Sequence, residues 1–174
     1  MRNTDEHRAR RVTPATKTPF APDRFDYADA FEIRLTAPDE RPAEEWMRCG
    51  LEEAPLPVRW TILVAHRFVL GFRLAPRSSP GNVLGWPIVT SVPDLAHLQA
   101  SSPLMVGDLV ARRDSPFQMT LFTYLSFNRR VLGRLIWVAV GPLHRTIAPY
   151  LLGWAARKDT SRLDANRRQG HTGD

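Results

Sequence analysis

The stretch from residue 83 to residue 140 constrains the fold most, because it contains a series of short β-rich runs with no helical pattern between them. Each run is bounded by Pro, Asn, Asp or Gly, residues that end strands and form turns. Consecutive strands joined by short turns pair antiparallel, whereas parallel neighbours need a long crossover connection. The sequence therefore predicts an antiparallel meander of five strands, which are VLGWPIVTS, LAHLQASS, LMVGDLVARR, QMTLFTYLSF and RVLGRLIWVAV.

The part of the chain before this stretch predicts one more strand and two helices. Residues 29–37 alternate apolar with polar side chains, as a half-buried strand does. Residues 43–51 place Glu44 and Glu45 in the first turn of a short helix, where acidic side chains interact favourably with the helix dipole. A second helix is predicted over residues 57–71, with an apolar stripe formed by Trp60, Leu63, Val64, Phe68 and Phe72.

The segment GRLIWVAVGPLHRTIAPYLLGWAARK, residues 133–158, passes from a β-branched run into a helix-period pattern at Gly141 and Pro142. Proline in the first turn of a helix removes no hydrogen bond, so we expect the last helix to begin there. Its apolar stripe would face the sheet and consists of Leu143, Ile147, Tyr150, Leu151 and Trp154. The predicted fold is α+β, with a curved antiparallel sheet in the order β-α-α-β-β-β-β-β-α wrapped around the long C-terminal helix and a cavity between them.

The length of 174 residues suits a single domain, and 43% hydrophobic with 24% charged residues is typical of a globular protein. Residues 1–24 and 159–174 are polar and lack apolar periodicity. We expect a disordered basic N-terminal tail in residues 1–24, one domain in residues 25–158 and a disordered C-terminal tail in residues 159–174.

The net charge of +6 would suit nucleic acid or an anionic membrane, but half of the excess positive charge lies in residues 1–24. No basic stripe with regularly interleaved aromatic residues is visible, and we expect no nucleic-acid partner.

The single cysteine, Cys49, excludes an internal disulfide, and its helical context favours a small buried thiol over a nucleophile. No secretory leader pattern follows the polar N-terminus, so we expect a cytoplasmic protein. The two most apolar stretches, residues 60–72 and 135–156, are interrupted by His-Arg pairs. We therefore expect no membrane span, which needs about 20 mostly apolar residues.

The chain resembles the START-like superfamily, also called SRPBCC or helix-grip, over residues 26–158. Its most specific segment is GRLIWVAVGPLHRTI, which looks like the closing signature of an uncharacterised-domain branch whose members stand alone or follow short-chain-dehydrogenase-like domains. In that signature Gly133, Arg134, Trp137, Pro142 and His144 stand where the branch has its Gly-Arg, aromatic, Pro and His. The superfamily has seven strands where six are counted here, and the remaining one is expected within residues 71–77.

The resemblance implies a hydrophobic cavity that takes lipids, polyketides, hormones or other small molecules. Some members of the superfamily are cofactor-free cyclases or aromatases, and many only bind a ligand. The fold alone does not decide between these functions.

A histidine and an aspartate are predicted to meet across two neighbouring strands. If Ser102 and Pro103 form a two-residue turn, Ser101 pairs with Leu104 and His97 lies directly opposite Asp108. In an apolar hollow this pair would act as a general base with its orienting partner, whereas on the solvent face it would be an ordinary surface pair. A change of register by one residue would remove the pairing.

The two faces of the last predicted hairpin differ in polarity. A two-residue turn at Asn128 and Arg129 pairs Tyr124 with Gly133, which leaves space beside the tyrosine. We expect the mixed face, with Gln118, Thr120, Phe122, Tyr124 and Ser126, to form the cavity wall. The more apolar face could equally be the core or a partner surface, and it carries Met119, Leu121, Thr123, Leu125 and Phe127.

His144 is expected at the positive end of the last helix, where the helix dipole favours the neutral imidazole. There it would contact a ligand carbonyl or anionic head, or else cap or pack the helix. The candidate catalytic residues are His97, Asp108 and His144. The candidate ligand-binding residues are Trp86, Gln99, Phe122, Tyr124, Gly133, Trp137, His144, Tyr150 and Trp154.

The sequence contains no Gly-rich phosphate loop, no G-x-S-x-G elbow and no Cys/His set with zinc spacing, so we expect no nucleotide, metal or other cofactor. The leading hypothesis is the binding of a hydrophobic small molecule that is lipid-, polyketide- or terpenoid-like. The main alternative is a cofactor-independent cyclase or isomerase, with His97 and Asp108, or His144 and Tyr124, as acid–base groups. A third possibility is a protein-interaction module that uses an exposed apolar face and the Arg-rich hairpin ends.

Overall fold

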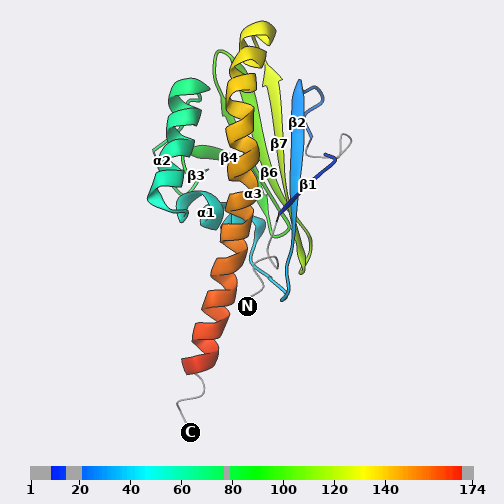
Figure 1. Ribbon diagram of the computed structural model, residues 1–174, viewed down its shortest axis with the longest axis vertical. Coiled ribbons are helices and arrows are strands. Elements are labelled where there is room, and N and C mark those ends of the chain that lie inside the picture. Colours follow the sequence, from blue (N-terminus) through cyan, green and yellow to red (C-terminus); the bar gives the residue numbers. More distant parts are fainter. Residues whose placement is uncertain (1–8, 15–20, 77–78, 170–174) are drawn as a thin grey trace.

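The computed structural model of the chain describes residues 9–14, 21–76 and 79–169, and within them seven antiparallel strands form one open sheet (Figure 1). The sheet order is β1-β2-β7-β6-β5-β4-β3. The strands are β1 (Arg10–Val12), β2 (Tyr27–Arg34), β3 (Asn82–Val83), β4 (Trp86–Val92), β5 (Leu95–Ser101), β6 (Met105–Ser115) and β7 (Gln118–Phe127). The helices are α1 (Ala43–Glu52), α2 (Leu56–Val64), the π-helical turn η1 (Ala65–Val69) and the long α3 (Arg130–Gln169). The α+β class, the antiparallel sheet and the long C-terminal helix are confirmed.

The prediction of a strand over residues 130–140 is wrong, because α3 already begins at Arg130 and the whole segment is helical. Strand β7 has no free edge for it, since β7 pairs with β6 on one side and with β2 on the other. The predicted pairing of Tyr124 with Gly133 is therefore absent: Tyr124 pairs with Ala28 and Asp108. Pro142 and Pro149 lie inside α3 instead of at its start.

Two further differences concern short strands. The predicted strand VLGWPIVTS is a hairpin, in which Leu84 and Gly85 form a two-residue turn between β3 and β4. Both turn residues have positive φ, as a type I′ turn requires, and a Cβ on Gly85 would lie 2.7 Å from the Ala75 oxygen. The extra strand expected within residues 71–77 is absent from residues 71–76, and residue 77 lies outside the described residues.

The predicted tails are partly ordered. Arg10–Val12 form β1, whose Arg10 pairs with Glu32 of β2 in backbone register and through an ion pair of 2.7 Å. Helix α3 continues to Gln169, beyond the expected domain end at residue 158. The remainder of the tail prediction that concerns residues 1–8, 15–20 and 170–174 lies outside the described residues.

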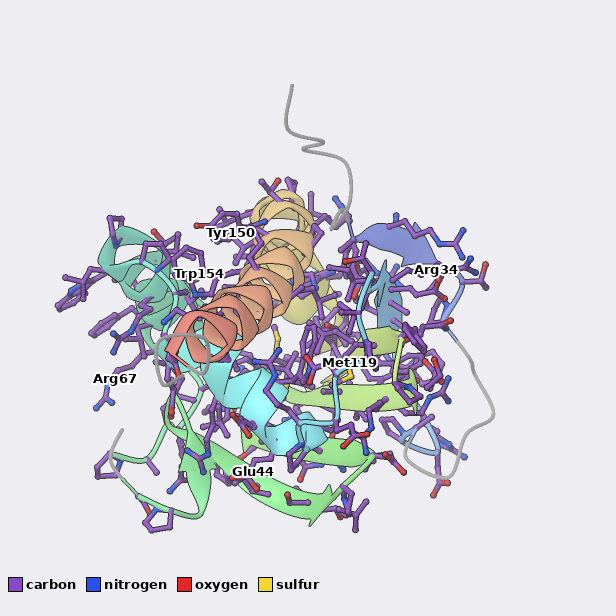
Figure 2. All side chains as sticks on the ribbon, turned by 90° about the horizontal axis from the view of Figure 1, so that it is seen from below. Arg34, Glu44, Arg67, Met119, Tyr150 and Trp154 are labelled. Atoms are coloured by element: carbon purple, nitrogen blue, oxygen red, sulfur yellow. The ribbon has the colours of Figure 1, made fainter. Side chains whose placement is uncertain are left out.

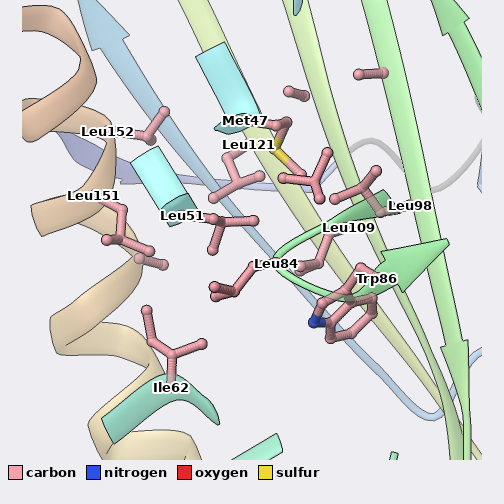
Figure 3. Close-up of a cluster of buried hydrophobic side chains, with 14 of the residues drawn as sticks. Met47, Leu51, Ile62, Leu84, Trp86, Leu98, Leu109, Leu121, Leu151 and Leu152 are labelled. Carbon is pink, nitrogen blue, oxygen red and sulfur yellow. The ribbon is translucent and has the colours of Figure 1, made fainter. Parts of the chain in front are cut away.

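The helices all cover one face of the sheet. Figure 1 shows α3 running back from the end of β7 across the sheet, with α1 and α2 beside it. Helix α1 approaches α3 closely, because a Cβ on Gly50 would lie 3.5 Å from the Leu151 oxygen. Figure 3 shows the resulting core, in which leucines of α1 and α3 meet Leu109 and Leu121 of the sheet. Cys49 of α1 is buried in this core, as predicted.

The sheet face that the helices cover is the apolar one, with Met119, Leu121, Thr123, Leu125 and Phe127 of β7. Phe31 pairs with Leu121 and lies in the same core cluster. The opposite face has a second cluster, formed by Ala30, Val110, Phe122 and Tyr124 with Phe25 packed against it. The assignment of the mixed face of β7 to the cavity wall is therefore wrong. The isolated hydroxyl groups on that face reflect its position outside the main core.

The helix predicted over residues 57–71 is confirmed as α2 and η1, but its buried side is different. Ile62, Ala65 and Leu70 are buried, whereas Trp60, Val64 and Phe68 of the predicted stripe are exposed. The π-turn contributes to this, because the Leu70 amide donates to the Ala65 oxygen five residues earlier (2.8 Å) and changes the helical phase.

We expect Gly133→Val to lower the free energy of unfolding by about 1–3 kcal/mol, because a Cβ there would lie 3.0 Å from the Phe127 ring. Arg134→Val is the matched control, since it puts the same β-branched side chain on the exposed side of the same helical turn. Urea denaturation of the two variants measures the difference. Equal stabilities would show that Gly133 does not pack on Phe127.

Candidate functional site

A cavity of about 80 Å³ lies between the sheet and the three helices. Its wall is mostly apolar, and the lining residues with polar side-chain atoms are Trp46, Thr61, His66, Trp137 and His144. The volume is roughly five times what one ordered water needs. The lining residues are Trp46, Met47, Gly50, Leu51, Thr61, Ile62, Ala65, His66, Leu70, Leu109, Ala111, Met119, Leu121, Trp137, Val140, Leu143, His144, Ile147, Ala148, Leu151, Leu152 and Ala155.

His66 reaches the cavity from the π-turn η1. Its Nδ1 accepts a hydrogen bond from Trp86 Nε1 at 3.1 Å, and an indole nitrogen can only donate. The neutral ring therefore carries its proton on Nε2. Burial, followed by the charge on His144, lowers the pKa of His66 to about 3. His66 thus stays neutral at physiological pH, with a fixed tautomer that presents Nε2–H as a donor.

His144 reaches the cavity from α3 and contacts a buried carboxylate. Its Nε2 lies 3.3 Å from Oδ1 of Asp29, whose side chain is fully buried on β2. The hydroxyl of Tyr27 donates to Oδ2 of the same carboxylate at 2.7 Å. Burial raises the pKa of Asp29, but hydrogen bonds and charge from His144, together with the Tyr27 hydroxyl, outweigh it, so the net shift is downward.

The ionised Asp29 fixes the direction of these hydrogen bonds. A carboxylate only accepts, so His144 donates through Nε2–H, and in its neutral form Nδ1 is the ring nitrogen left for a ligand. Burial and the hydrogen bond to Asp29 raise the pKa of Tyr27, which keeps its phenol protonated. Tyr27, Asp29 and His144 form a connected acid–base network beside the apolar cavity.

Trp137 adds a buried donor near this network. Its ring packs against Tyr27 at 4.8 Å and against His144 at 5.3 Å between ring centroids. Its Nε1 is buried and has no hydrogen-bond partner among the residues that the structure describes. A buried donor without a partner costs stability, and such groups often mark a site where a ligand or water is missing.

Two of the nine candidate ligand-binding residues, Trp137 and His144, line the cavity. Phe122 and Tyr124 lie on the opposite sheet face, and Gly133 packs against Phe127. Trp86 is buried behind His66 and holds it through the indole hydrogen bond.

The remaining three candidates lie away from the cavity. Gln99 donates to Asp108 at 2.8 Å. Figure 2 shows Tyr150 and Trp154 on the side of α3 that faces away from Met119 of the sheet. Trp154 donates to the Glu53 oxygen at 3.1 Å, so this indole fastens α3 to the end of α1.

His97 and Asp108 form the predicted contact but not the predicted site. His97 Nε2 and Asp108 Oδ1 are 2.7 Å apart. The register differs by two residues, because His97 pairs with Val110 and Gln99 pairs with Asp108. The turn is wider than predicted, with Ser101 opposite Val106. An even change of register keeps both side chains on one face, and that face is opposite to the cavity.

The placement of His144 at the positive end of a helix is also wrong. His144 lies in α3, roughly four turns after its first residue, Arg130, so the helix dipole has little effect there. The buried carboxylate of Asp29 takes the place of the dipole as the partner that orients the imidazole.

Sequence reasoning missed Asp29, Tyr27 and His66 as site residues. Tyr27 and Asp29 alternate along a strand and so share one face, a signal that could have been read. The contact between β2 and α3 could not be predicted from the sequence, because Asp29 and His144 are 115 positions apart. His66 stood outside the predicted apolar stripe, and the π-turn that aims it has no sequence signature here.

Helix α3 is long and apolar enough between Arg130 and Lys158 to cross a membrane, judged by length and composition alone. The core helix of a soluble protein passes the same test, so this is weak evidence for a span.

Among the described residues no group of three His, Cys, Asp or Glu side chains is placed to hold a metal ion.

No protein-family model matches the chain, and neither a curated protein nor a solved structure matches it.

We expect the free energy of unfolding to fall by about 2 kcal/mol between pH 7 and pH 5, because the unfolded His66, with a pKa near 6.5, takes up a proton that the folded ring, with a pKa of about 3, refuses. Because the pKa of His66 is lower in the folded than in the unfolded state, its contribution to stability is complete above pH 6.5 and decreases as the pH falls toward 3. Urea denaturation at several pH values measures this slope.

His66→Asn is the control, since the amide oxygen can replace Nδ1 as acceptor for Trp86 but does not titrate. This variant should lose most of the slope. A slope equal to that of the wild type would show that His66 is not the group responsible.

Proposed function

We propose that this protein binds a hydrophobic small molecule in the cavity between the sheet and α3. The observation that carries the proposal is an apolar cavity of about 80 Å³ with a few polar groups at its edge. Ligand sites are commonly concave and apolar, with a small number of polar groups that orient the ligand. The sequence expectation of a hydrophobic ligand fits this cavity, although its wall is the other face of β7.

We also propose that the fold is of the helix-grip, START-like type. The order β2-α1-α2-β3-β4-β5-β6-β7-α3, with β2 beside β7 and α3 on one face, supports this proposal. The proposal also keeps the cytoplasmic location that is expected from the sequence.

The polar groups favour a ligand with a hydrogen-bond acceptor. His66 presents Nε2–H, because Nδ1 is occupied by Trp86. The ring of Trp137 also lines the cavity. A donor in an apolar wall suits a carbonyl, ester or hydroxyl oxygen on an otherwise apolar molecule. The small volume suits a compact ligand or the end of a longer chain.

Short linear alcohols test this proposal, because each combines an apolar chain with one oxygen. In calorimetric titrations with butanol, pentanol and hexanol, we expect affinity to rise roughly fourfold per added methylene until the cavity is full. Ala148→Leu should weaken hexanol binding at least about tenfold, since Ala148 lines the cavity and the larger side chain fills it.

Ala139→Leu is the matched control, because Ala139 is exposed on the same helix. Ala111→Val reduces the cavity from the sheet side and serves if Ala148→Leu does not fold. Equal binding by wild type and both cavity variants would reject the cavity as the ligand site.

A second candidate function is cofactor-independent proton transfer, which the network of Tyr27, Asp29 and His144 supports. A histidine held by a carboxylate at the edge of an apolar cavity is a suitable general base. The acid–base residues named from the sequence are replaced in this version, except for His144. Asp29 takes the role that was assigned to Asp108.

Exchange of the α-hydrogens of 2-butanone in D₂O tests this candidate. A base at Nδ1 of His144 should accelerate exchange above the buffer rate, and proton NMR measures it. Asp29→Asn should reduce the rate about tenfold or more, because the orienting carboxylate is lost. His97→Asn is the control, since His97 lies on the other sheet face. A wild-type rate equal to that of buffer alone would reject this candidate.

A further inference from the structure

The outer sides of α2 and α3 carry an exposed apolar surface, which we call the docking face. Phe68 and Val131 are 75% and 77% exposed, although both are large apolar residues. Soluble monomers rarely expose many such residues together. The docking face consists of Leu56, Trp60, Val64, Phe68 and Val69 on α2 and η1, and of Val131, Leu132, Leu135, Val138 and Leu143 on α3.

The two parts of the docking face lie on either side of the cavity mouth. Thr61 of α2 and Leu143 of α3 both line the cavity and are both exposed, so the cavity reaches the surface between these helices. Figure 1 shows α2 next to the first half of α3. On α2, Leu56, Trp60 and Val64 recur every four residues and form one stripe beside Thr61.

The charge of α2, of η1 and of the part of α3 before Asp159 is of one sign. Between Glu53 and Asp94 the sequence has no Asp or Glu and four arginines. Between Asp114 and Asp159 it has no Asp or Glu, five arginines and one lysine.

Several of these arginines are exposed and have no acidic partner within residues 9–14, 21–76 and 79–169. Arg67, Arg129, Arg130 and Arg134 form no ion pair with any carboxylate in the described part of the chain. Figure 2 shows Arg67 pointing outward from the molecule. The docking face therefore combines apolar side chains with unneutralised positive charge.

We propose that the docking face binds to the surface of an anionic lipid membrane. Exposed Trp, Phe and Leu side chains would enter the boundary between headgroups and acyl chains, and the arginines would remain among the headgroups. Positive charge near an anionic leaflet adds electrostatic attraction within a Debye length. This binding does not depend on a ligand in the cavity.

The arrangement favours a membrane surface over the other occupants. A span by α3 would remove Trp137 and Leu151 from the core and separate His144 from Asp29. A symmetric contact with a second copy would bring like-charged arginines together. Eight of the ten docking-face residues are aliphatic and offer nucleic-acid bases no stacking surface.

Vesicle sedimentation with the full chain tests the proposal. We expect binding to vesicles of phosphatidylcholine mixed with phosphatidylglycerol, about tenfold weaker binding to phosphatidylcholine alone, and a decrease with added NaCl. Phe68→Ser should weaken binding to the anionic vesicles about tenfold. Phe117→Ser is the matched control, since Phe117 is 50% exposed in the turn between β6 and β7.

The charge is tested separately with Arg67→Gln and Arg134→Gln combined, which should weaken binding and flatten its salt dependence. Arg34→Gln is the control, because Arg34 lies 3.4 Å from its partner Glu32. Ala148→Leu should bind vesicles like the wild type, so failure of the ligand proposal is distinguished from failure of this one.

Three outcomes would overturn the proposal. The first is no sedimentation with anionic vesicles. The second is an equal loss for Phe68→Ser and Phe117→Ser. The third is a dimer in analytical ultracentrifugation that Phe68→Ser dissociates while vesicle binding is absent, which would make the docking face a contact between two copies of the chain.

Discussion

The short junction between β7 and α3 is the constraint on which the rest of the structure depends. Only Asn128 and Arg129 separate the strand from the helix, and both amides donate to the Leu104 oxygen. Gly133 lets the first turn of α3 pack on the Phe127 ring. The helix therefore has to turn back across the face that carries Phe127. This direction of α3 determines which face of the sheet is covered by the helices and lies in the protein core.

The position of α3 accounts for the polar groups inside an otherwise apolar core. With α3 across β2, His144 meets Asp29, and a buried carboxylate is stable only with such partners. Because α1 lies between the second half of α3 and the sheet, the three helices and the sheet enclose a space that leucines do not fill. The acid–base network and the apolar cavity have the same origin.

The fold was more predictable from sequence than the site. Strands β4 to β7 were found because turn residues separate short β-rich runs, and α1 was found by its acidic first turn. The contact between His97 and Asp108 was predicted correctly although the strand register was off by two residues, because an even shift leaves both side chains on the same sheet face. The segment from Val131 to Val140 was read as a strand, because β-branched residues suit both a strand and a helix that is exposed on one side.

The sequence by itself determined the α+β class and the antiparallel pairing of consecutive strands, since these follow from periodicity and turn chemistry within short windows. Only the tertiary structure decided which sheet face is internal, that β2 takes the free edge of β7, and that Asp29 holds His144. The pairing of β2 with β7 and the contact of Asp29 with His144 join residues that are 84 to 115 positions apart. Local propensity is nearly neutral toward such contacts, and the burial gained by the whole chain selects among them.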